Sequence, residues 1–368
     1  MLDILLYVFI GIVILQFIYY IGVFGKFSFA KLQNNTPKRI PVSVIVCAKN
    51  EAENIQKFVP LLLEQNYPDF ELVLIDDSSI DNTLELFEAF EKNHTNIKLV
   101  KVKNNEAFWG NKKFALTLGI KAAKNEYLLF TDADCYPTSK DWIKEMSAHF
   151  TLKKTIVLGY GAYEKISGSF LNKLIRFETL FTAIQYFSWA KVGKPYMGVG
   201  RNLAYKREEF FKVNGFIEHI KLRSGDDDLF INQASDAKNT TICFSPDSFT
   251  YSKPKTTFSE WFNQKRRHVS TAKHYKSFDR FQLGLFFVSQ FLFVTLAIAL
   301  VAFQHEWIVV TSIILGRYLF SWISLGYAAN KLKEKDVMYW YPIIEIALLV
   351  THINVFLTNM FSKPVHWK

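Results

Sequence analysis

Cysteine is scarce in this chain of 368 residues, and its pattern excludes two common kinds of stabilising cross-link. The three cysteines, Cys47, Cys135 and Cys243, form no CxxC pair and no cluster with histidine. This spacing argues against a disulfide framework and against a structural zinc site. Half of all residues are apolar, which also excludes a disordered chain.

A nucleic-acid-recognition motif is missing as well, although the chain is basic. The 44 Lys and Arg residues outnumber the 34 Asp and Glu residues and leave a net charge of +10. Basic, aromatic-rich chains can bind nucleic acids. Here the aromatic residues fall largely in long apolar runs, so we expect a membrane, and no nucleic acid, as the partner.

Charged residues are absent from residues 4–24, a run of 21 residues that is long enough to cross a bilayer as a helix. No basic residue precedes this run and no small-residue cleavage site follows it, so we expect a membrane anchor rather than a signal peptide. Three further apolar runs, 283–303, 307–327 and 337–361, predict three C-terminal transmembrane helices.

The charges around these spans predict an orientation. Lys26, Lys31, Lys38 and Arg39 follow the first span, and no basic residue precedes it. The positive-inside rule therefore predicts an integral protein of the inner (cytoplasmic) membrane with its middle part in the cytoplasm.

Two charges lie inside the predicted spans. Arg317 and Glu345 fall at similar depths of the third and fourth spans. An ion pair between them would lower the cost of burying both, and we expect it to serve packing rather than transport.

Residues 32–277 are predicted to form a soluble domain between an N-terminal membrane segment, 1–31, and a C-terminal membrane domain, 278–368. In the first half of the soluble domain, strand-like runs alternate with helical patterns. Strands are expected at 42–47, 72–76, 97–102 and 127–131, and helices at 52–65, 83–92 and 112–124. This order predicts an α/β fold with a Rossmann-like, doubly wound and mostly parallel sheet.

Polar residues follow three of these strands, at the edge where such sheets bind their ligands. Lys49 and Glu51 follow the first strand, Asp76 ends the second, and Asp132 and Asp134 follow the fourth. Acidic residues in these places can also cap the next helix, and for Asp76 and Asp77 both interpretations stay open. The pair Asp132-x-Asp134 is more specific, because two neighbouring carboxylates favour a cation between them. Mg²⁺ or Mn²⁺, held together with substrate phosphates, fits such a pair.

Seven segments, in this order, resemble the family 2 glycosyltransferases, which have the GT-A fold. They are SVIVCAKNEAENI, LVLIDDSSIDNT, GNKKFALTLGI, YLLFTDADC, MGVGRNLAYKREEF, GDDDLF and QKRRH, and they extend over roughly residues 40–270. The chain is most similar in plan to membrane-anchored members such as ceramide glucosyltransferase-like and polysaccharide synthase-like enzymes. The resemblance implies a GT-A domain carried by membrane helices.

The resemblance also implies which residues bind the donor, a nucleotide sugar with UDP as the expected nucleotide. Lys49, Glu51, Asp76, Lys112 and Asp132 are expected to contact it. Lys112 takes the place of the family's Gly-Lys lysine, although Asn111 separates it from Gly110 in this chain. Asp134, together with Asp132, is expected to hold the metal.

The acidic run Gly225-Asp226-Asp227-Asp228 lies where the family has its catalytic base. One alignment makes Asp227 the group that takes the proton from the acceptor hydroxyl, and another makes it Asp226. We favour Asp227 and keep Asp226 as the alternative.

A basic amphipathic helix is predicted within residues 256–278. Gln264, Arg267 and His268 resemble the QxxRW motif of membrane-embedded members, with His268 in place of the tryptophan. This implies that Gln264 and Arg266 contact the donor and that Arg267 stabilises the departing diphosphate. The same helix can lie on anionic lipids, and both roles are compatible.

Two further stretches each allow two interpretations. Apolar residues from Phe170 to Ile184 follow helical spacing, and for this helix we favour contact with the lipid surface over a place in the core. The stretch from Gly198 to Asn202 resembles the family's acceptor- or sugar-contacting segment, or is a tight turn before a strand.

The sequence thus predicts a metal-dependent, inverting hexosyltransferase that moves a sugar from a nucleotide diphosphate to a membrane lipid or lipid-linked acceptor at the cytoplasmic leaflet. A processive polysaccharide synthase is the alternative within the class, although the spans offer few polar groups for a channel. A non-catalytic nucleotide-binding membrane scaffold is the alternative from another class. It is disfavoured because carboxylates and arginine occupy every catalytic position.

Overall fold

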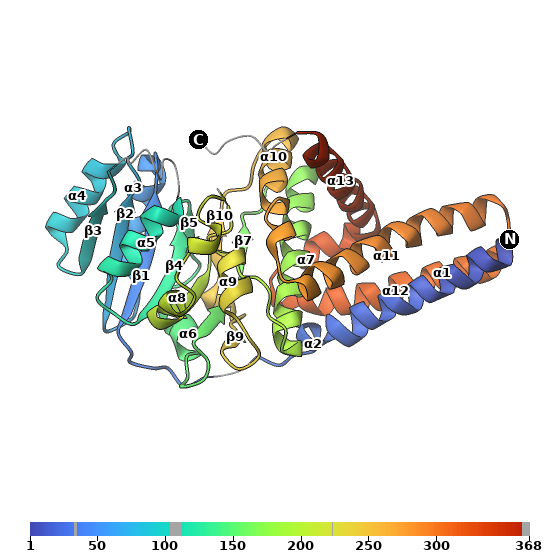
Figure 1. Ribbon diagram of the computed structural model, residues 1–368, viewed down its shortest axis with the longest axis horizontal. Helices are drawn as coiled ribbons and strands as arrows, with labels where there is room; N and C mark the ends of the chain where they lie inside the picture. Colours follow the sequence, from blue (N-terminus) through green and yellow to red (C-terminus); the bar gives the residue numbers. More distant parts are fainter. Residues whose placement is uncertain (33–34, 104–111, 223, 363–368) are drawn as a thin grey trace. The chain divides into compact units, whose positions relative to one another are not determined.

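The structure is a computed structural model that describes residues 1–32, 35–103, 112–222 and 224–362. The chain packs as two compact units, whose elements are labelled in Figure 1. The sheet unit consists of Leu32–Ile166 and Gly193–Lys255, and the membrane unit consists of Met1–Lys31, Ser167–Val192 and the described residues from Thr256 on. The domain boundaries predicted from the sequence, after residues 31 and 277, remain predictions.

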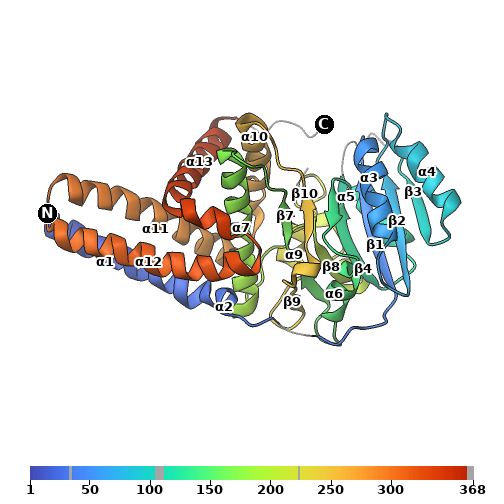
Figure 2. The same cartoon turned by 180° about the vertical axis from the view of Figure 1, so that it is seen from behind.

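The sheet unit is built on a seven-stranded sheet in the order β3-β2-β1-β4-β8-β6-β9. Its strands are β1 (Val42–Ala48), β2 (Phe70–Asp76), β3 (Ile97–Lys101), β4 (Tyr127–Asp132), β6 (Ile156–Leu158), β8 (Leu203–Lys206) and β9 (Thr240–Ile242). The first four are parallel, β8 runs antiparallel to both of its neighbours, and β9 is parallel to β6. The predicted mostly parallel α/β sheet is confirmed, and Figure 2 shows it from behind.

Helices connect the parallel strands where the sequence predicts them. They are α3 (Ala52–Leu63), α4 (Thr83–Asn93) and α5 (Lys112–Ala122), followed by α6 (Trp142–Ala148), α8 (Arg207–Lys212) and α9 (Asp228–Ala234). On α3, Ile55, Val59 and Leu62 are buried at one-turn spacing and join the core with strand residues such as Val44 and Leu74. Burial of each such side chain contributes about 1.5–3 kcal/mol, which fixes the helix to the sheet.

A second, three-stranded sheet in the order β5-β10-β7 lies within the same unit. It consists of β5 (Cys135–Pro137), β7 (Gly161–Tyr163) and β10 (Thr250–Ser252). Ser252 pairs with Cys135 on one side and with Tyr163 on the other. Short one-turn segments, η3 (Ile217–His219) and η4 (Pro246–Ser248), complete this unit.

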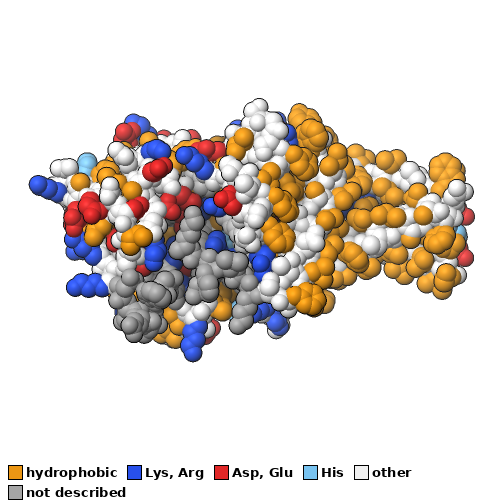
Figure 3. Space-filling view, turned by 90° about the horizontal axis from the view of Figure 1, so that it is seen from above, with side chains coloured by type: hydrophobic (Ala, Val, Ile, Leu, Met, Phe, Trp, Pro, Cys, Tyr) orange, Lys and Arg blue, Asp and Glu red, His pale blue; other side chains and the backbone are white. Residues whose placement is uncertain are grey.

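The membrane unit contains four helical segments that are long and apolar enough to cross a membrane, Leu2–Ser28, Ser277–Ala302, Trp307–Lys331 and Lys335–Phe361. They comprise α1 (Leu2–Phe17), η1 (Ile18–Val23), α2 (Gly25–Ser28), α11 (Ser277–Ala302), α12 (Trp307–Lys331), η6 (Lys335–Trp340) and α13 (Tyr341–Phe361). Apolar side chains cover the surface over α1, α11 and α12 in Figure 3. The predicted plan of one N-terminal and three C-terminal spans is confirmed, as expected for an integral membrane protein.

The predicted ion pair between Arg317 and Glu345 is present in the interior of this unit. Both Nη atoms of Arg317 donate to the Glu345 carboxylate at 2.7 Å. The remaining donors of the guanidinium reach Gln16, Tyr20 and Tyr341. Because the charge and its hydrogen bonds are satisfied by protein groups, the pair joins the first, third and fourth spans, as a packing role requires.

Two amphipathic helices belong to the membrane unit, α7 (Phe170–Val192) and α10 (Phe258–Val269), and η5 (Ala272–His274) follows α10. On α7 the residues Phe177 and Ile184 are buried, with Phe177 against Tyr341. This face of α7 is protein core, and the expectation that it rests on the lipid surface is wrong. The aromatic spacing alone did not distinguish lipid from the apolar side chains of neighbouring helices.

Candidate active site

The carboxyl ends of β1 and β2 carry two loops that are joined by their own polar groups. Asn50 donates its backbone N–H to Ser79 and accepts from the backbone of Ile80. Asn50 and Ser78 both have positive φ, which non-glycine residues rarely adopt. Strain of this kind is retained where the surrounding structure fixes it, often at a binding site.

Asp76, at the end of β2, is buried, and its carboxylate accepts from the backbone of Ser79. The capping of α3 and α4 is done instead by Asp81, which accepts from the backbone of Ala52 and Thr83. Asp76 therefore stabilises its own loop and caps neither helix, so the capping interpretation of Asp76 is wrong. Its role in donor binding stays a prediction.

Lys49 and Glu51 lie on the loop after β1. Burial raises the pKa of Glu51, and the carboxylates of Asp134 and Asp132 add to this, while a hydrogen bond from Asn54 opposes it. Burial likewise raises the pKa of Asp77, and the charge of Lys49 acts in the opposite direction. The loop is thus an acidic environment in which Lys49 provides positive charge.

Lys112, the first residue of α5, joins two of the predicted acidic positions. Its Nζ lies 2.6 Å from Asp132 Oδ1 and 3.1 Å from Asp226 Oδ2. Asp132 ends β4, whereas Asp226 lies almost a hundred residues later, so the lysine connects the two halves of the sheet unit. Gly110 and Asn111, the other residues of the predicted Gly-Lys motif, lie outside the described residues.

The acidic run follows Gly225, which has a backbone conformation that other residues do not adopt easily. Gly225 has φ +93°, and a Cβ atom there would lie 2.5 Å from Leu229. Asp227 then caps α9 by accepting from the backbone of Asp228 at 2.8 Å. Gly200 donates its backbone N–H to the other oxygen of Asp227 at 2.6 Å.

The surroundings of Asp226 and Asp227 shift the pKa values of the two carboxyls in opposite directions. Burial raises the pKa of Asp227 to about 7, with the charges of Asp226 and Asp228 adding to this effect. Burial also acts on Asp226, but the adjacent Lys112 outweighs it and lowers the pKa of that carboxyl. Neighbouring acids with separated pKa values are a pattern of acid–base sites, and they make Asp227 the group suited to take up a proton near neutral pH.

Lys113 is a functional candidate that the sequence did not reveal. Its side chain is 1% exposed, and its Nζ donates to the backbone carbonyls of His219, Leu222 and Ser224 at 2.8–3.1 Å. Burial lowers its pKa to about 8, although Asp226 and its neighbours act in the opposite direction. Two adjacent lysines at a helix start look alike in the sequence, yet Lys112 pairs with acids and Lys113 holds the loop that leads to Asp226.

The predicted metal ligands meet at the end of β4. Ligand atoms of Asp132, Asp134 and Cys135 all lie within 4.8 Å of one another. Asp132 is paired with Lys112, whereas Asp134 has no ion-pair partner among the residues that the structure describes. Two close carboxylates of which one lacks a counter-charge fit a divalent cation such as Mg²⁺ or Mn²⁺.

A small cavity of about 20 Å³ brings several of these groups together. Its lining includes Cys47, Lys112, Asp132, Gly200, Asp226 and Asp227. This is the carboxyl edge of the parallel strands, where ligands of such sheets bind. The structure therefore gathers both acidic motifs and the predicted lysine at one place.

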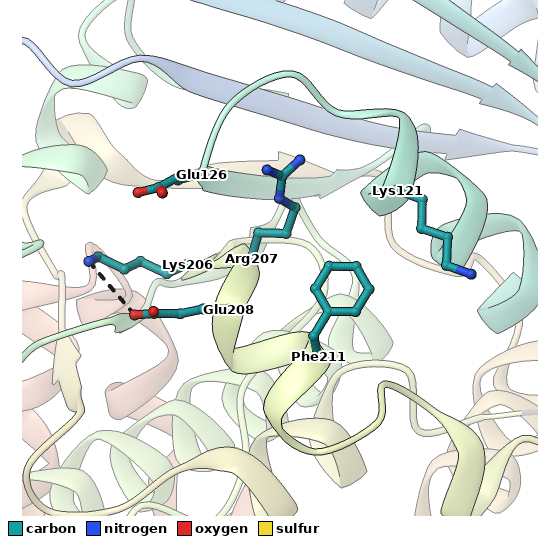
Figure 4. Close-up of a pocket in the computed structure, with 6 residues that line it drawn as sticks. All are labelled: Lys121, Glu126, Lys206, Arg207, Glu208 and Phe211. Atoms are coloured by element: carbon teal, nitrogen blue, oxygen red, sulfur yellow. Dashed lines mark ion pairs between the residues drawn. The ribbon is translucent and has the colours of Figure 1, made fainter.

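A larger cavity, of about 390 Å³, lies at the opposite end of the strands (Figure 4). It is lined by Lys121, Glu126, Lys206, Arg207, Glu208 and Phe211. Lys206, in the lining of this cavity, pairs with Tyr127, the first residue of β4. Asp132 is the last residue of the same strand, so the two cavities are separated by about 17 Å along β4. None of the predicted site residues lines this cavity, so size alone does not identify the active site.

Gln264, Arg266 and Arg267 lie on α10, in the membrane unit. Arg266 is buried and donates to Asn359 Oδ1 and to Ser362, at the end of α13. This side chain fastens α10 to α13. The donor-binding roles of Gln264 and Arg266 and the catalytic role of Arg267 stay predictions.

Comparison with known proteins assigns part of the chain to a family. Residues 43–222 match the sequence model of Glycosyl transferase family 2, a stretch that begins in β1 and ends in the loop that Lys113 binds. This part of the chain belongs to glycosyl transferase family 2. The predicted family is thereby confirmed, and the family 2 segment contains every donor-binding and metal-binding residue predicted on the parallel strands and α5.

The chain is similar to curated relatives whose names give different products. It is 38% identical over 93 residues to the poly-β-1,6-N-acetyl-D-glucosamine synthase of Staphylococcus epidermidis, a match that covers 25% of this chain and 21% of that protein. It is 33% identical over 93 residues to the cholesterol galactosyltransferase of Borreliella burgdorferi, which covers 25% of each protein. The chain thus matches only about a fifth to a quarter of these curated relatives.

A solved structure matches over most of the chain. A mannosyltransferase from Pyrobaculum calidifontis, in complex with GDP-Man and Mn²⁺, aligns with a TM-score of 0.59 at 20% identity, over 90% of this chain and 97% of that one. The likeness confirms the GT-A fold that the sequence predicts.

Proposed function

We propose that the protein is a metal-dependent, inverting glycosyltransferase that moves a sugar from a nucleotide diphosphate to a membrane lipid or lipid-linked acceptor. The observation that carries the proposal is the pairing of Asp226 with Asp132 through Lys112, beside the proton-accepting Asp227. Membership of family 2 and the GDP-Man and Mn²⁺ bound by the Pyrobaculum calidifontis mannosyltransferase support a nucleotide-sugar donor and a divalent ion.

In the proposed reaction, Asp227 accepts the proton of the acceptor hydroxyl as the oxygen attacks the anomeric carbon. The bond from that carbon to the diphosphate breaks, and the nucleotide diphosphate leaves with the electron pair. Attack from the face opposite the leaving group inverts the configuration. Lys112 places a positive charge beside the donor, and the loops at Glu51 and Asp76 surround the nucleotide.

Asp134 and Asp132 would hold the divalent ion, which supplies positive charge for the leaving diphosphate. Because Asp132 also pairs with Lys112, its charge would be shared between the ion and the lysine. Arg267, on α10, is proposed to assist the same leaving group. We place the sheet unit in the cytoplasm, because the basic residues after the first span predict that side.

The lipid acceptor is favoured by the four spans and by the cholesterol galactosyltransferase relative. A processive polysaccharide synthase is the second candidate, since another relative makes a polymer. The charged pair inside the spans, Arg317 and Glu345, is satisfied by protein groups and therefore does not offer its charges to a polar channel for a polymer. This observation favours a single transfer to lipid.

The proposal is tested with the full chain in lipid nanodiscs, a panel of UDP- and GDP-sugars and a membrane lipid extract. We expect one donor class to release its nucleotide in the presence of Mg²⁺ or Mn²⁺, and mass spectrometry to find a lipid that has gained one hexose. EDTA-insensitive release would contradict the metal requirement. A polymer ladder on a gel would favour the synthase, and failure of every donor would favour the scaffold.

A further inference from the structure

Arg201 is a cation beside the acidic site to which the family resemblance gives no individual role. It follows Gly200, whose backbone binds Asp227, and its guanidinium lies over the ring of Tyr163 at 4.3 Å. Its Nη1 donates to the Ala162 carbonyl at 3.1 Å and to Ser252 Oγ at 3.0 Å. The side chain is therefore held at one end of its planar group.

The backbone of Arg201 is fixed from both sides. Thr250 Oγ1 donates to the carbonyl of Arg201 at 2.9 Å. The next residue, Asn202, is fully buried and binds the carbonyls of Tyr160 and Ser248 through its side-chain amide. A residue anchored in this way presents its side chain in one place at little further entropic cost.

The three-stranded sheet offers a shaped support for the guanidinium. Tyr163, Ser252 and Cys135 pair in one row across β7, β10 and β5, and Arg201 contacts the first two of them. Gly161 leaves space next to Tyr163, because a Cβ atom there would lie 2.9 Å from Arg201 Cβ and 3.3 Å from Arg201 Nε. Arg201 can therefore occupy this position only because Gly161 has no side chain.

The charge of Arg201 is not neutralised by a direct partner. No carboxylate of the described residues lies within ion-pair distance of it, and its Nε and Nη2 make no hydrogen bond to any described residue. Burial would lower its pKa, but Tyr163, Cys135, Asp134 and Asp132 outweigh this and raise it. The guanidinium thus stays charged, partly buried and with unused donors, at a cost that an anionic ligand would offset.

We propose that Arg201 binds a phosphate oxyanion of one of the two substrates, through the N–H groups that the Tyr163 and Ser252 contacts leave unused. A planar guanidinium with several donors matches phosphate oxygens, and its stacking on an aromatic ring leaves the fork accessible. The inference rests on the proposed function and adds a substrate contact to it. The phosphate belongs either to the donor's diphosphate or to a phosphate-bearing acceptor lipid.

Isothermal titration calorimetry of the full chain in nanodiscs with Mn²⁺ tests whether the phosphate that Arg201 binds belongs to the donor. The probes are UDP and GDP, each compared with its nucleoside. If the donor supplies the phosphate, Arg201→Gln raises the Kd of the nucleotide that the native chain binds by at least tenfold, and it leaves nucleoside binding within twofold. Arg201→Lys gives an intermediate loss, because a lysine keeps the charge without the fork.

Inhibition of donor turnover by dodecyl phosphate, compared with dodecyl alcohol, tests whether the phosphate that Arg201 binds belongs to the acceptor. If the acceptor supplies the phosphate, Arg201→Gln leaves nucleotide binding unchanged and raises the inhibitory concentration of dodecyl phosphate at least tenfold. The alcohol serves as the neutral comparison and is expected to change less than twofold. An effect in either assay supports the proposal and identifies the source.

Arg207→Gln is the matched control, because Arg207 also donates to a backbone carbonyl, that of Ala123, but lies at the opposite end of the strands. Gly161→Ala displaces the Arg201 side chain without removing it, and it is expected to reproduce the loss even if Arg201→Gln fails to fold. The proposal is overturned if the Arg201 and Gly161 variants stay within twofold of the native chain in both assays. Asp134→Asn is measured alongside: if it too is without effect, the proposed function fails, and otherwise the Arg201 inference fails alone.

Discussion

Asp132 and Asp226 share the ammonium of Lys112, at 2.6 and 3.1 Å. One carboxylate ends the central strand β4, and the other precedes α9. A lysine between two acids keeps them close despite their repulsion. The relationship links the predicted metal-binding pair to the acidic run that contains the candidate base, Asp227.

Lys112→Met is expected to raise the Kd of nucleotide diphosphates about tenfold or more, because charge-assisted hydrogen bonds contribute about 1.5–3 kcal/mol each. Mn²⁺ binding should persist or tighten, since the carboxylates lose a competing cation. Calorimetry with nucleotide and electron paramagnetic resonance of Mn²⁺ measure the two effects separately. Lys121→Met, in the last turn of the same helix, is the control, and equal behaviour of both variants would contradict the role of Lys112.

Lys113→Met removes three hydrogen bonds to the loop that leads to Asp226. We expect faster hydrogen exchange in residues 219–225 and a lower kcat, although Lys113 has no place in the reaction itself. The free energy of unfolding should fall by about 2–4 kcal/mol, from several lost bonds to one charged group. An unchanged exchange rate in this loop, in a variant that still folds, would show that the tether does not position Asp226.

The sequence predicted the half of the sheet unit whose elements are long and regular. Runs such as Val42–Ala48 are apolar on both faces, and helices such as α3 repeat their apolar residues at one-turn spacing. The strand β8 was expected only in one of the two interpretations of residues 198–202, and the strands β5, β7 and β10 were not predicted. Each has only three or four residues, too few for a periodic signal, and their pairing is decided by contacts far apart in the chain.

The same limit applies to the site. Asp132, Asp134 and the acidic run stand out by type and spacing, and the Arg317–Glu345 pair could be predicted from counted depth. Arg201 required the strands that carry Tyr163 and Ser252, which no local pattern brings together. Arg266 lies inside the segment that resembles the QxxRW motif, yet its side chain reaches Asn359, because the packing of α10 on α13 is set by tertiary contacts.

The pH dependence follows from Asp227, whose carboxyl must be ionised to accept a proton. Burial and the charges of Asp226 and Asp228 raise its pKa to about 7, and Lys113 lies near enough to interact with it. We expect kcat/KM to rise with pH up to about 7 and then to level, with a value about 100-fold lower at pH 5 than at pH 8. A profile that is flat between pH 5 and 8 would contradict this assignment.

The same shift predicts a stability effect of Asp227→Asn. The unfolded carboxyl ionises near its ordinary pKa of 3.8, whereas the folded one resists ionisation until about pH 7. The native aspartate therefore destabilises the fold increasingly as pH rises between these values, and to a constant extent above them. Thermal unfolding should show that Asp227→Asn stabilises the protein more at pH 8 than at pH 5. If Asp227→Asn stabilised the protein more at pH 5 than at pH 8, the pKa of the Asp227 carboxyl would not be raised in the folded protein.

Arg317→Met is expected to lower the stability of the chain in detergent by about 3–5 kcal/mol, because it leaves Glu345 buried without its partner. The double variant Arg317→Met with Glu345→Met should recover part of this loss. Donor turnover per folded molecule should stay unchanged in both variants. A loss of turnover in the stable double variant would assign the pair a functional role beyond packing.

The most direct measurement is sugar transfer by Asp227→Asn under saturating donor and divalent ion. The single amide oxygen of asparagine can keep either the cap of α9 or the contact with Gly200, so the change removes the proton acceptor and one of these two hydrogen bonds. Asp69→Asn, at an exposed position, is the control. We predict that Asp227→Asn binds the nucleotide as tightly as the native chain and transfers sugar at least 100-fold more slowly. Native transfer by Asp227→Asn, or the same selective loss only in Asp226→Asn, would contradict the assignment of the base.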